Sequence, residues 1–169
     1  MNKLIKYGDK TLRKIPELLI LPDKSHREKI DEMVRICVEH HGYAIAGNQI
    51  GWDAKAFIVR MEHITGKDEV LVIFNPELIG FSEEEVDFDE SCLSLPSIKV
   101  KIRRPNEVRI KYFTEEGKEE IIEGKGLLAR VFQHEMDHLR GKLIIDYMTP
   151  LEKTFIKNKL KRIKRGQFD

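Results

Sequence analysis

The stretch QHEMDHLRG (residues 133–141) places two histidines, His134 and His138, four residues apart around Glu135. This spacing is typical of a helix with both imidazoles on one inward face, and Gly141 is placed to end that helix. Two imidazoles one turn apart can chelate a metal ion, with the glutamate beside them as a candidate general base. Because so short a motif also arises by chance, and buried histidines often only fill a core, a metal site needs a further ligand elsewhere.

The first half of the chain predicts a helix followed by strands. Residues 25–42 carry apolar side chains at helical spacing, Ser25 and Glu28 form a capping-box pattern, and Gly42 is placed as the stop. The middle of the chain then changes to a strand period. The expected strands, the last of them a hairpin, cover residues 56–61, 70–76, 98–103 and 108–122.

The second half returns to the helical period at Leu127, which together with Val131 extends the face of the two histidines. A last helix, residues 151–165, has apolar positions on one side and lysine or arginine elsewhere. Those apolar positions are Phe155, Ile156, Leu160 and Ile163. Helices on either side of a block of antiparallel strands indicate an α+β fold.

Composition predicts one domain, residues 1–169. The chain is 41% hydrophobic, enough for its length to bury a core without disulfides or structural metals. Its net charge of +1 favours neither DNA nor a membrane surface as a partner. No apolar stretch is long enough to span a bilayer, so we expect a cytoplasmic location, where Cys37 and Cys92 would remain free thiols.

Candidates for a third metal ligand lie on both sides of the motif. Metzincin peptidases use a later histidine, but that position is Ile144, and the only later glutamate, Glu152, lies near the start of the basic terminal helix. Cys37 falls on the apolar stripe of the first helix, which favours a core role. Cys92, in DESCLSLPSIKV (residues 89–100), is the better candidate, because a thiolate and two imidazoles suit a tetrahedral site with one position left for water. The alternative is a buried, inert cysteine.

Three separated segments resemble the peptide deformylase family, in its order and spacing. GYAIAGNQ (residues 42–49) resembles G-x-G-L-A-A-x-Q, ESCLS (residues 90–94) resembles E-G-C-L-S, and the third segment is QHEMDHL (residues 133–139). Shorter matches such as TLRK and RRP extend the resemblance over nearly the whole chain. It implies antiparallel strands packed around a central metal-binding helix, with an N-terminal helix and a C-terminal helix.

The resemblance implies that Cys92, His134 and His138 hold one metal ion. It also implies a metal-dependent hydrolase, whose substrate is the nascent formylated polypeptide. The formyl group would be removed from the N-terminal methionine, with release of formate. A Cys-His-His donor set suits ferrous iron, zinc, nickel or cobalt, and the resemblance favours iron as Fe2+ over Zn2+, Ni2+ or Co2+.

The resemblance also implies which residues act on the substrate. Glu135 would take a proton from the attacking water and later pass it to the departing amine. The Gln49 side-chain amide and the Leu93 backbone N–H would donate hydrogen bonds to the oxyanion of the tetrahedral intermediate. Glu90 and Arg104 resemble a structural ion pair that braces the cysteine loop.

Five further residues would contact the substrate by family position. Phe88, Leu127 and Val131 would line an apolar pocket for the methionine side chain. Tyr43 and Ala44 would present backbone groups to the peptide. Because Leu127 and Val131 share the face of the histidines, the alternative is that these two only pack the core beneath the metal.

The chain departs from the family's pattern near the site. Ala44 replaces the second glycine, Gly47 and Asn48 replace the usual small residue and the following proline, and Ser91 replaces the glycine before Cys92. A positive φ at residue 44 or 91 would strain a non-glycine residue and lower activity. These departures leave a non-catalytic or altered-substrate deformylase-like protein as an alternative. A metallopeptidase is less favoured, because its usual third ligand is missing.

The terminal segment, residues 150–166, is the one local concentration of positive charge. Such a basic helix is typical either of a solvated surface or of a surface that contacts RNA, because basic side chains bind phosphate without choice of sequence. The resemblance favours the second interpretation, with the ribosome as a partner.

Overall fold

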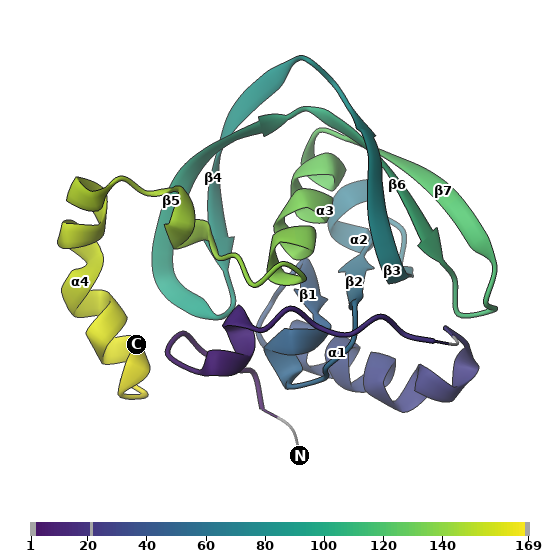
Figure 1. Cartoon of the computed structure of the whole chain (residues 1–169), viewed down its shortest axis with the longest axis horizontal. Coiled ribbons are helices and arrows are strands. Elements are labelled where there is room, and N and C mark those ends of the chain that lie inside the picture. Colours follow the sequence, from purple (N-terminus) through teal and green to yellow (C-terminus); the bar gives the residue numbers. More distant parts are fainter. Residues whose placement is uncertain (1–2, 21, 168–169) are drawn as a thin grey trace.

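The computed structural model describes residues 3–20 and 22–167, and two antiparallel sheets and a central helix organise them (Figure 1). The helix is α3 (Leu127–His138). The larger sheet has the order β1-β2-β3-β6-β7, and the smaller sheet pairs β4 with β5. The larger sheet consists of β1 (Ala44–Ala46), β2 (Ala56–Arg60), β3 (Val70–Phe81), β6 (Glu107–Phe113) and β7 (Glu119–Lys125). The smaller sheet consists of β4 (Glu85–Cys92) and β5 (Leu95–Pro105).

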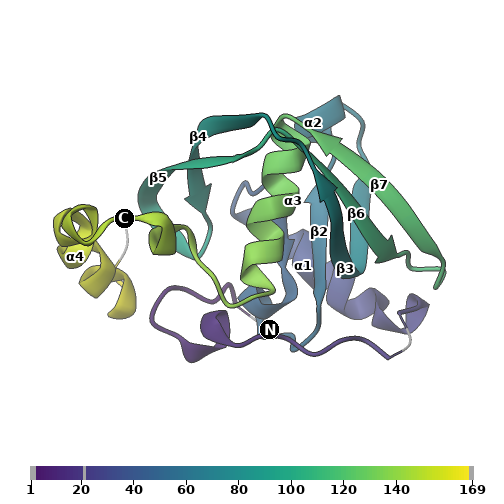
Figure 2. The same ribbon diagram turned by 45° about the horizontal axis from the view of Figure 1, so that its top comes forward.

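Three other helices surround this centre. Helix α1 (Arg27–Glu39) packs against β1 and β2, the short α2 (Glu62–Thr65) follows β2, and α4 (Pro150–Lys164) contacts β5. Figure 2 shows α3 between the smaller sheet and the larger one, with α4 set to the outside of β5. Short 3-10 turns complete the chain: η1 (Lys10–Arg13), η2 (Lys24–His26), η3 (Gly47–Ile50) and η4 (Ile144–Tyr147). The expected α+β fold, with strands around a central helix, is confirmed.

The core divides according to these layers. One apolar cluster lies between the larger sheet and α3 and includes Phe57 and Phe132. A second lies between that sheet and α1, and includes Cys37, which is fully buried as a core residue as expected. The third joins β5 to η4 and α4 and includes Cys92. Helix α3 therefore has apolar support on the side of the larger sheet, and its other side is left for the site.

The start and stop expected for the first helix are wrong. The Ser25 side chain does not cap it; the Asp23 carboxylate instead accepts a hydrogen bond from the Ser25 N–H, so the 3-10 turn η2 forms first. After α1 ends, the chain reverses at His41, which has φ 54°, and not at Gly42. Gly42 is needed for another reason: a Cβ there would lie 2.7 Å from Leu93 Cδ1. The glycine thus lets α1 lie close to the loop after Cys92.

The two later helices form where the sequence predicts them, with one correction. Gly141, with φ 68°, ends the α3 segment, and a Cβ there would lie 2.4 Å from the Arg13 carbonyl oxygen. Thr149 caps α4. Ile163 is buried in the third cluster, but Phe155 is 78% exposed and does not belong to the packed side of α4. Among the described residues, no helix has both the length and the apolar character needed to cross a membrane.

Candidate metal centre

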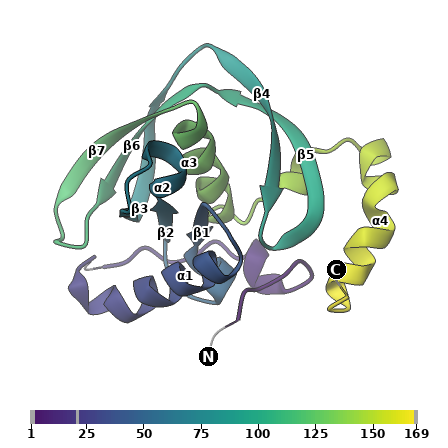
Figure 3. The same ribbon diagram turned by 180° about the vertical axis from the view of Figure 1, so that it is seen from behind.

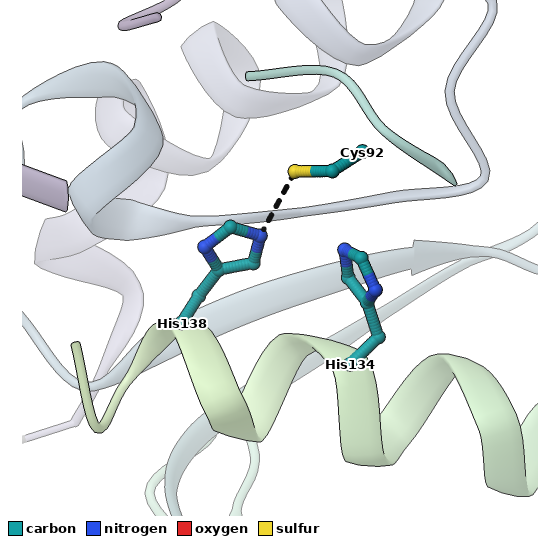
Figure 4. A group of neighbouring side chains, drawn as sticks. All are labelled: Cys92, His134 and His138. Atoms are coloured by element: carbon teal, nitrogen blue, oxygen red, sulfur yellow. Dashed lines mark hydrogen bonds between the residues drawn. The ribbon is translucent and has the colours of Figure 1, made fainter. Parts of the chain in front are cut away.

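Cys92 lies opposite two histidines of α3 (Figure 4). Its Sγ and one ring nitrogen each of His134 and His138 lie within 4.8 Å of one another, and Sγ is 3.3 Å from His138 Nε2. A tetrahedral ion with ordinary bond lengths to sulfur and nitrogen needs these atoms about 3.5 Å apart. The donor set therefore fits a metal ion in chemistry, and the distance between Cys92 Sγ and His138 Nε2 fits one in spacing.

The cysteine reaches this position at the end of β4, where the β4–β5 ladder closes in a tight turn. The register shifts between Ser91 and Cys92, and Cys92 then pairs with Leu95 across a tight turn. Cys92 keeps the face of Glu90, two residues earlier in β4, because alternate residues of a strand point to the same side, and the extra residues at this shift belong to β5. For the histidines, helical spacing alone puts His134 and His138 on one face.

Glu90 orients the first histidine. Its carboxylate lies 3.0 Å from His134 Nδ1 and accepts two hydrogen bonds from Arg104, at 2.6 and 3.0 Å. Arg130 donates a further bond at 2.9 Å, and these carboxylate and guanidinium groups are buried. Burial opposes the charge of Glu90, but the bonds from His134 and Arg104 lower its pKa to about 2. The carboxylate thus holds a proton on Nδ1, which leaves Nε2 of His134 for a metal.

The same surroundings favour the thiolate of Cys92. Burial opposes ionisation, but the imidazoles of His138 and His134 hold the pKa of the thiol well below its usual value. Burial also opposes a charge on His134, yet its bonds to Cys92 and Glu90 raise the pKa of the imidazole well above the usual value. The thiolate is the form of cysteine that binds metals.

Glu135 is a buried carboxyl group at the edge of the site. Burial raises its pKa to about 7, and the negative charges of Cys92 and Glu90 add to that effect against the opposing imidazoles. Within the described part of the chain, its Oε2 atom has no hydrogen-bond partner. A buried polar oxygen is costly to leave unpaired, and Glu135 lines a cavity, so the unpaired oxygen points to a ligand there.

Gln49 is held so that its amide nitrogen points toward the cysteine. Its Oε1 accepts a hydrogen bond of 2.9 Å from the Ala46 N–H. Its Nε2 donates to Ser94 Oγ at 3.0 Å and lies 3.7 Å from Cys92 Sγ. The carbonyl end is therefore fixed to the backbone, and the donor end is directed into the site.

A cavity of about 540 Å³ opens above these groups. The five residues expected to contact substrate all line it, together with Gln49, Leu93 and Glu135; they are Tyr43, Ala44, Phe88, Leu127 and Val131. Leu127 and Val131 also pack in the first core cluster, so these two residues belong both to the wall of the cavity and to the core. Two residues near the site have no signal of their own in the sequence: Lys6, which also lines the cavity, and Ser94, which lies within the ESCLS segment.

The substitutions near the site do not strain the backbone. Ala44 lies in β1 and Ser91 in β4, and the described non-glycine residues with positive φ are His41, Asn75 and Ser97. The expectation that a positive φ at residue 44 or 91 lowers activity therefore does not apply. Asn48 is buried and donates a hydrogen bond of 2.7 Å to the His138 carbonyl.

The alternative ligands are engaged elsewhere. The Glu152 carboxylate accepts hydrogen bonds from Thr149 at the start of α4. Ile144 is buried in the third core cluster. Among the described residues, the cluster of potential ligands is therefore the one formed by Cys92, His134 and His138.

Comparisons with known proteins agree over nearly the whole chain. The polypeptide deformylase family model matches residues 1–154. Peptide deformylase 1 of Ralstonia nicotianae is 35% identical over 159 residues, covering 94% of this chain and 93% of that protein. The peptide deformylase of Fusobacterium nucleatum is 36% identical over 165 residues, covering 96% and 92%.

A solved structure extends this likeness to three dimensions. The crystal structure of a peptide deformylase from Legionella pneumophila matches with a TM-score of 0.89 at 34% identity, covering 99% of this chain and 97% of that one. Because this match covers 99% of the chain, it extends over the sheets and the central helix that carry the site. The matched family model, the relatives and the fold together place this chain in the polypeptide deformylase family.

Proposed function

We propose that Cys92, His134 and His138 hold one divalent metal ion in the deformylation reaction of this family. The family's members remove the N-formyl group from nascent polypeptides, and this chain is a metallohydrolase of that kind. The observation that carries the proposed ligand set is the convergence of a thiolate and two imidazoles within 4.8 Å beside a cavity. When bound, the ion would supply a Lewis acid that lowers the pKa of water and polarises a carbonyl.

Glu135 would move the proton. It lies next to His134 in the sequence and lines the same cavity, with one buried carboxylate oxygen unpaired. It would accept a proton from the water that attacks the formyl carbon. The departing amine would then receive this proton, so the same carboxyl group serves as base and then as acid.

Two donors would stabilise the oxyanion. Gln49 Nε2 is directed into the site by the bond between its Oε1 and the Ala46 N–H. The Leu93 backbone N–H follows Cys92 directly in the chain. Gln49 Nε2 keeps its bond to Ser94 Oγ, and its second hydrogen, now directed at Cys92 Sγ, would turn to the oxyanion as charge develops.

The remaining cavity residues would bind the formylmethionyl end of the chain. Phe88, Leu127 and Val131 would surround the methionine side chain, and Tyr43 and Ala44 would offer backbone groups to the peptide. Tyr43 is stacked on His63, with ring centroids 4.3 Å apart, which steadies this edge of the cavity. For the physiological metal we propose Fe2+, because the soft thiolate and two imidazoles suit it and the family favours it; Zn2+, Ni2+ or Co2+ would occupy the same ligands.

Formate release tests this proposal directly. Protein prepared without oxygen and loaded with iron or nickel is given a formylmethionyl peptide, with the unformylated peptide alongside. The matched variant is Glu135→Ala, with its metal content measured. We expect release that falls by a factor of about 10² or more in the variant, as for other general acid–base residues. No release by folded, metal-loaded protein would refute the proposal and favour a non-catalytic or altered-substrate protein.

We propose further that residues 1–169 fold as a single domain and that the protein acts in the cytoplasm.

We also propose that the basic helix over residues 150–166 contacts ribosomal RNA. The support for this contact is a row of exposed lysines on α4. Exchange of three of them for glutamate should weaken ribosome binding and make its salt dependence shallower. The exchanged residues are Lys153, Lys157 and Lys161, and the matched controls are Lys24, Lys67 and Lys118. Equal binding by both triple variants would contradict the RNA contact.

A further inference from the structure

The segment of residues 5–7 joins the two parts of the chain that carry the proposed oxyanion donors. Its Ile5 N–H donates to the Gln49 carbonyl at 2.8 Å, and its Tyr7 N–H donates to the Ser94 carbonyl at 2.9 Å. The Ser94 hydroxyl donates to the Ile5 carbonyl at 2.7 Å and accepts from Gln49 Nε2 at 3.0 Å. The start of the chain passes close to the turn between β4 and β5 (Figure 1 and Figure 3).

Lys6 adds a side-chain contact to this junction. Its ammonium group donates to the Leu93 carbonyl at 2.7 Å, and the side chain is half-buried at the wall of the cavity. A charged donor makes a stronger hydrogen bond to a carbonyl than a neutral one does. The bond therefore restrains the peptide group that follows Leu93.

That restraint bears on the direction of the Leu93 N–H. The N–H and the carbonyl of one residue belong to adjoining peptide planes, joined by its two soft backbone dihedrals. Cys92 fixes the plane on one side when it binds a metal, and Lys6 fixes the plane on the other side. With both planes held, the N–H has little freedom to change its direction.

We propose that Lys6 is a positioning residue for deformylation, which holds the Leu93 loop so that its backbone N–H faces the oxyanion. This inference rests on the proposed roles of Leu93 and Gln49. Lys6 acts through Leu93 and does not touch the reacting atoms. The backbone bonds from Ile5 and Tyr7 also tie the segment to both loops, and these bonds remain when the Lys6 side chain is replaced.

The test compares three variants as metal-loaded full-length proteins. Lys6→Met removes the donor, Lys6→Arg keeps a charged donor, and Lys3→Met, the control, removes an exposed lysine three residues earlier in the chain. In Lys6→Met, kcat should fall about tenfold, less than on losing an oxyanion donor outright, with KM changed by less than about twofold. Lys6→Arg should recover most of the rate, and Lys3→Met should match the wild type.

A second measurement reports on the loop itself. Amide hydrogen exchange of the peptide containing residues 92–95 should be about tenfold faster in Lys6→Met than in Lys3→Met, with the metal content and the Tm unchanged. A wild-type rate in Lys6→Met, or a rise confined to KM, would overturn the positioning role; the latter would assign Lys6 to substrate binding. A fall in Tm that accounts for the lost activity would overturn it too. Absence of formate release from the wild-type protein would instead remove the proposed function on which the inference rests.

Discussion

Replacement of Glu90 by glutamine would expose how far one buried carboxylate controls the metal site. Glutamine keeps the shape of the side chain but turns one acceptor oxygen into an N–H donor. In the wild-type protein, Oε2 of Glu90 faces both His134 Nδ1 and a nitrogen of Arg104. If the amide donor faces His134, the imidazole must move its proton to Nε2, the nitrogen left for a metal. A protonated nitrogen cannot bind the ion.

Two magnitudes follow from these contacts. Loss of a partner that orients a metal-binding histidine typically weakens metal affinity by about 10–100-fold. The change also leaves the buried guanidinium of Arg130 without its carboxylate, while Arg104 keeps Asp137 at 2.8 Å. Breaking a buried ion pair costs about 3–5 kcal/mol. For a domain of this size the Tm should fall by about 6–20 °C.

The assay is metal titration against a chelator, together with thermal unfolding of the metal-free proteins. Glu85→Gln is the matched control, because Glu85 lies on the same strand and pairs with Arg103 at 3.2 Å on an exposed surface. Such a pair contributes at most about 1 kcal/mol. If Glu90→Gln binds metal as the control does and unfolds within about 2 °C of it, the reasoning about His134 is wrong.

Three further outcomes test the description of the core and the backbone. Burial raises the pKa of the Cys37 thiol to about 12, so native protein at pH 8 should resist alkylation there until it unfolds, as peptide mass spectrometry would detect. Burial likewise raises the pKa of Tyr112 to about 12. The Cys37 thiol and the Tyr112 phenol therefore stay neutral up to a higher pH in the folded protein than in the unfolded chain. Stability is therefore retained below about pH 9 and falls as the pH rises toward 12, and a urea midpoint that rose over this range would contradict the burial. Gly141→Ala should destabilise by about 2 kcal/mol or more, because the added Cβ would meet the Arg13 carbonyl, whereas Gly66→Ala, at φ 75° with open space, should cost about 1 kcal/mol; equal Tm values would argue against the close approach.

Helix α3 could be predicted because the residues that define it lie close together in the sequence. The spacing of His134 and His138 sets their common face, and Gly141 marks the end of the segment. The identity of Cys92 as a candidate came from donor chemistry, but its position depends on the pairing of β4 with β5, which brings it to the histidines of α3. Because β4 is mostly exposed, the periodicity of its sequence does not reveal that pairing.

Other elements escaped prediction for a related reason. Strand β4 is mostly exposed, with little apolar alternation, and it exists because β5 supplies its partner. Strand β1 has only three residues and lies within the segment that resembles the family's glycine-rich motif. The Lys6 contact joins residues 87 positions apart, and the chain gives no local hint of it. Phe155 has the right spacing for the packed side of α4 yet remains exposed, because periodicity cannot say how much of a helix a neighbour covers.

The position of the three candidate ligands on two separate layers has a mechanical consequence. Cys92 belongs to the smaller sheet and His138 to the central helix, 46 positions later. An ion bound to both closes a loop of that length in the folded and partly unfolded chain alike. By the entropy of loop closure, a permanent link of this kind is worth about 4 kcal/mol. The ion would thus act as a reversible cross-link between the smaller sheet and the helix. Oxidation of the thiolate would release the ion and remove this cross-link. Loss of activity in air would then involve partial unfolding as well as oxidation.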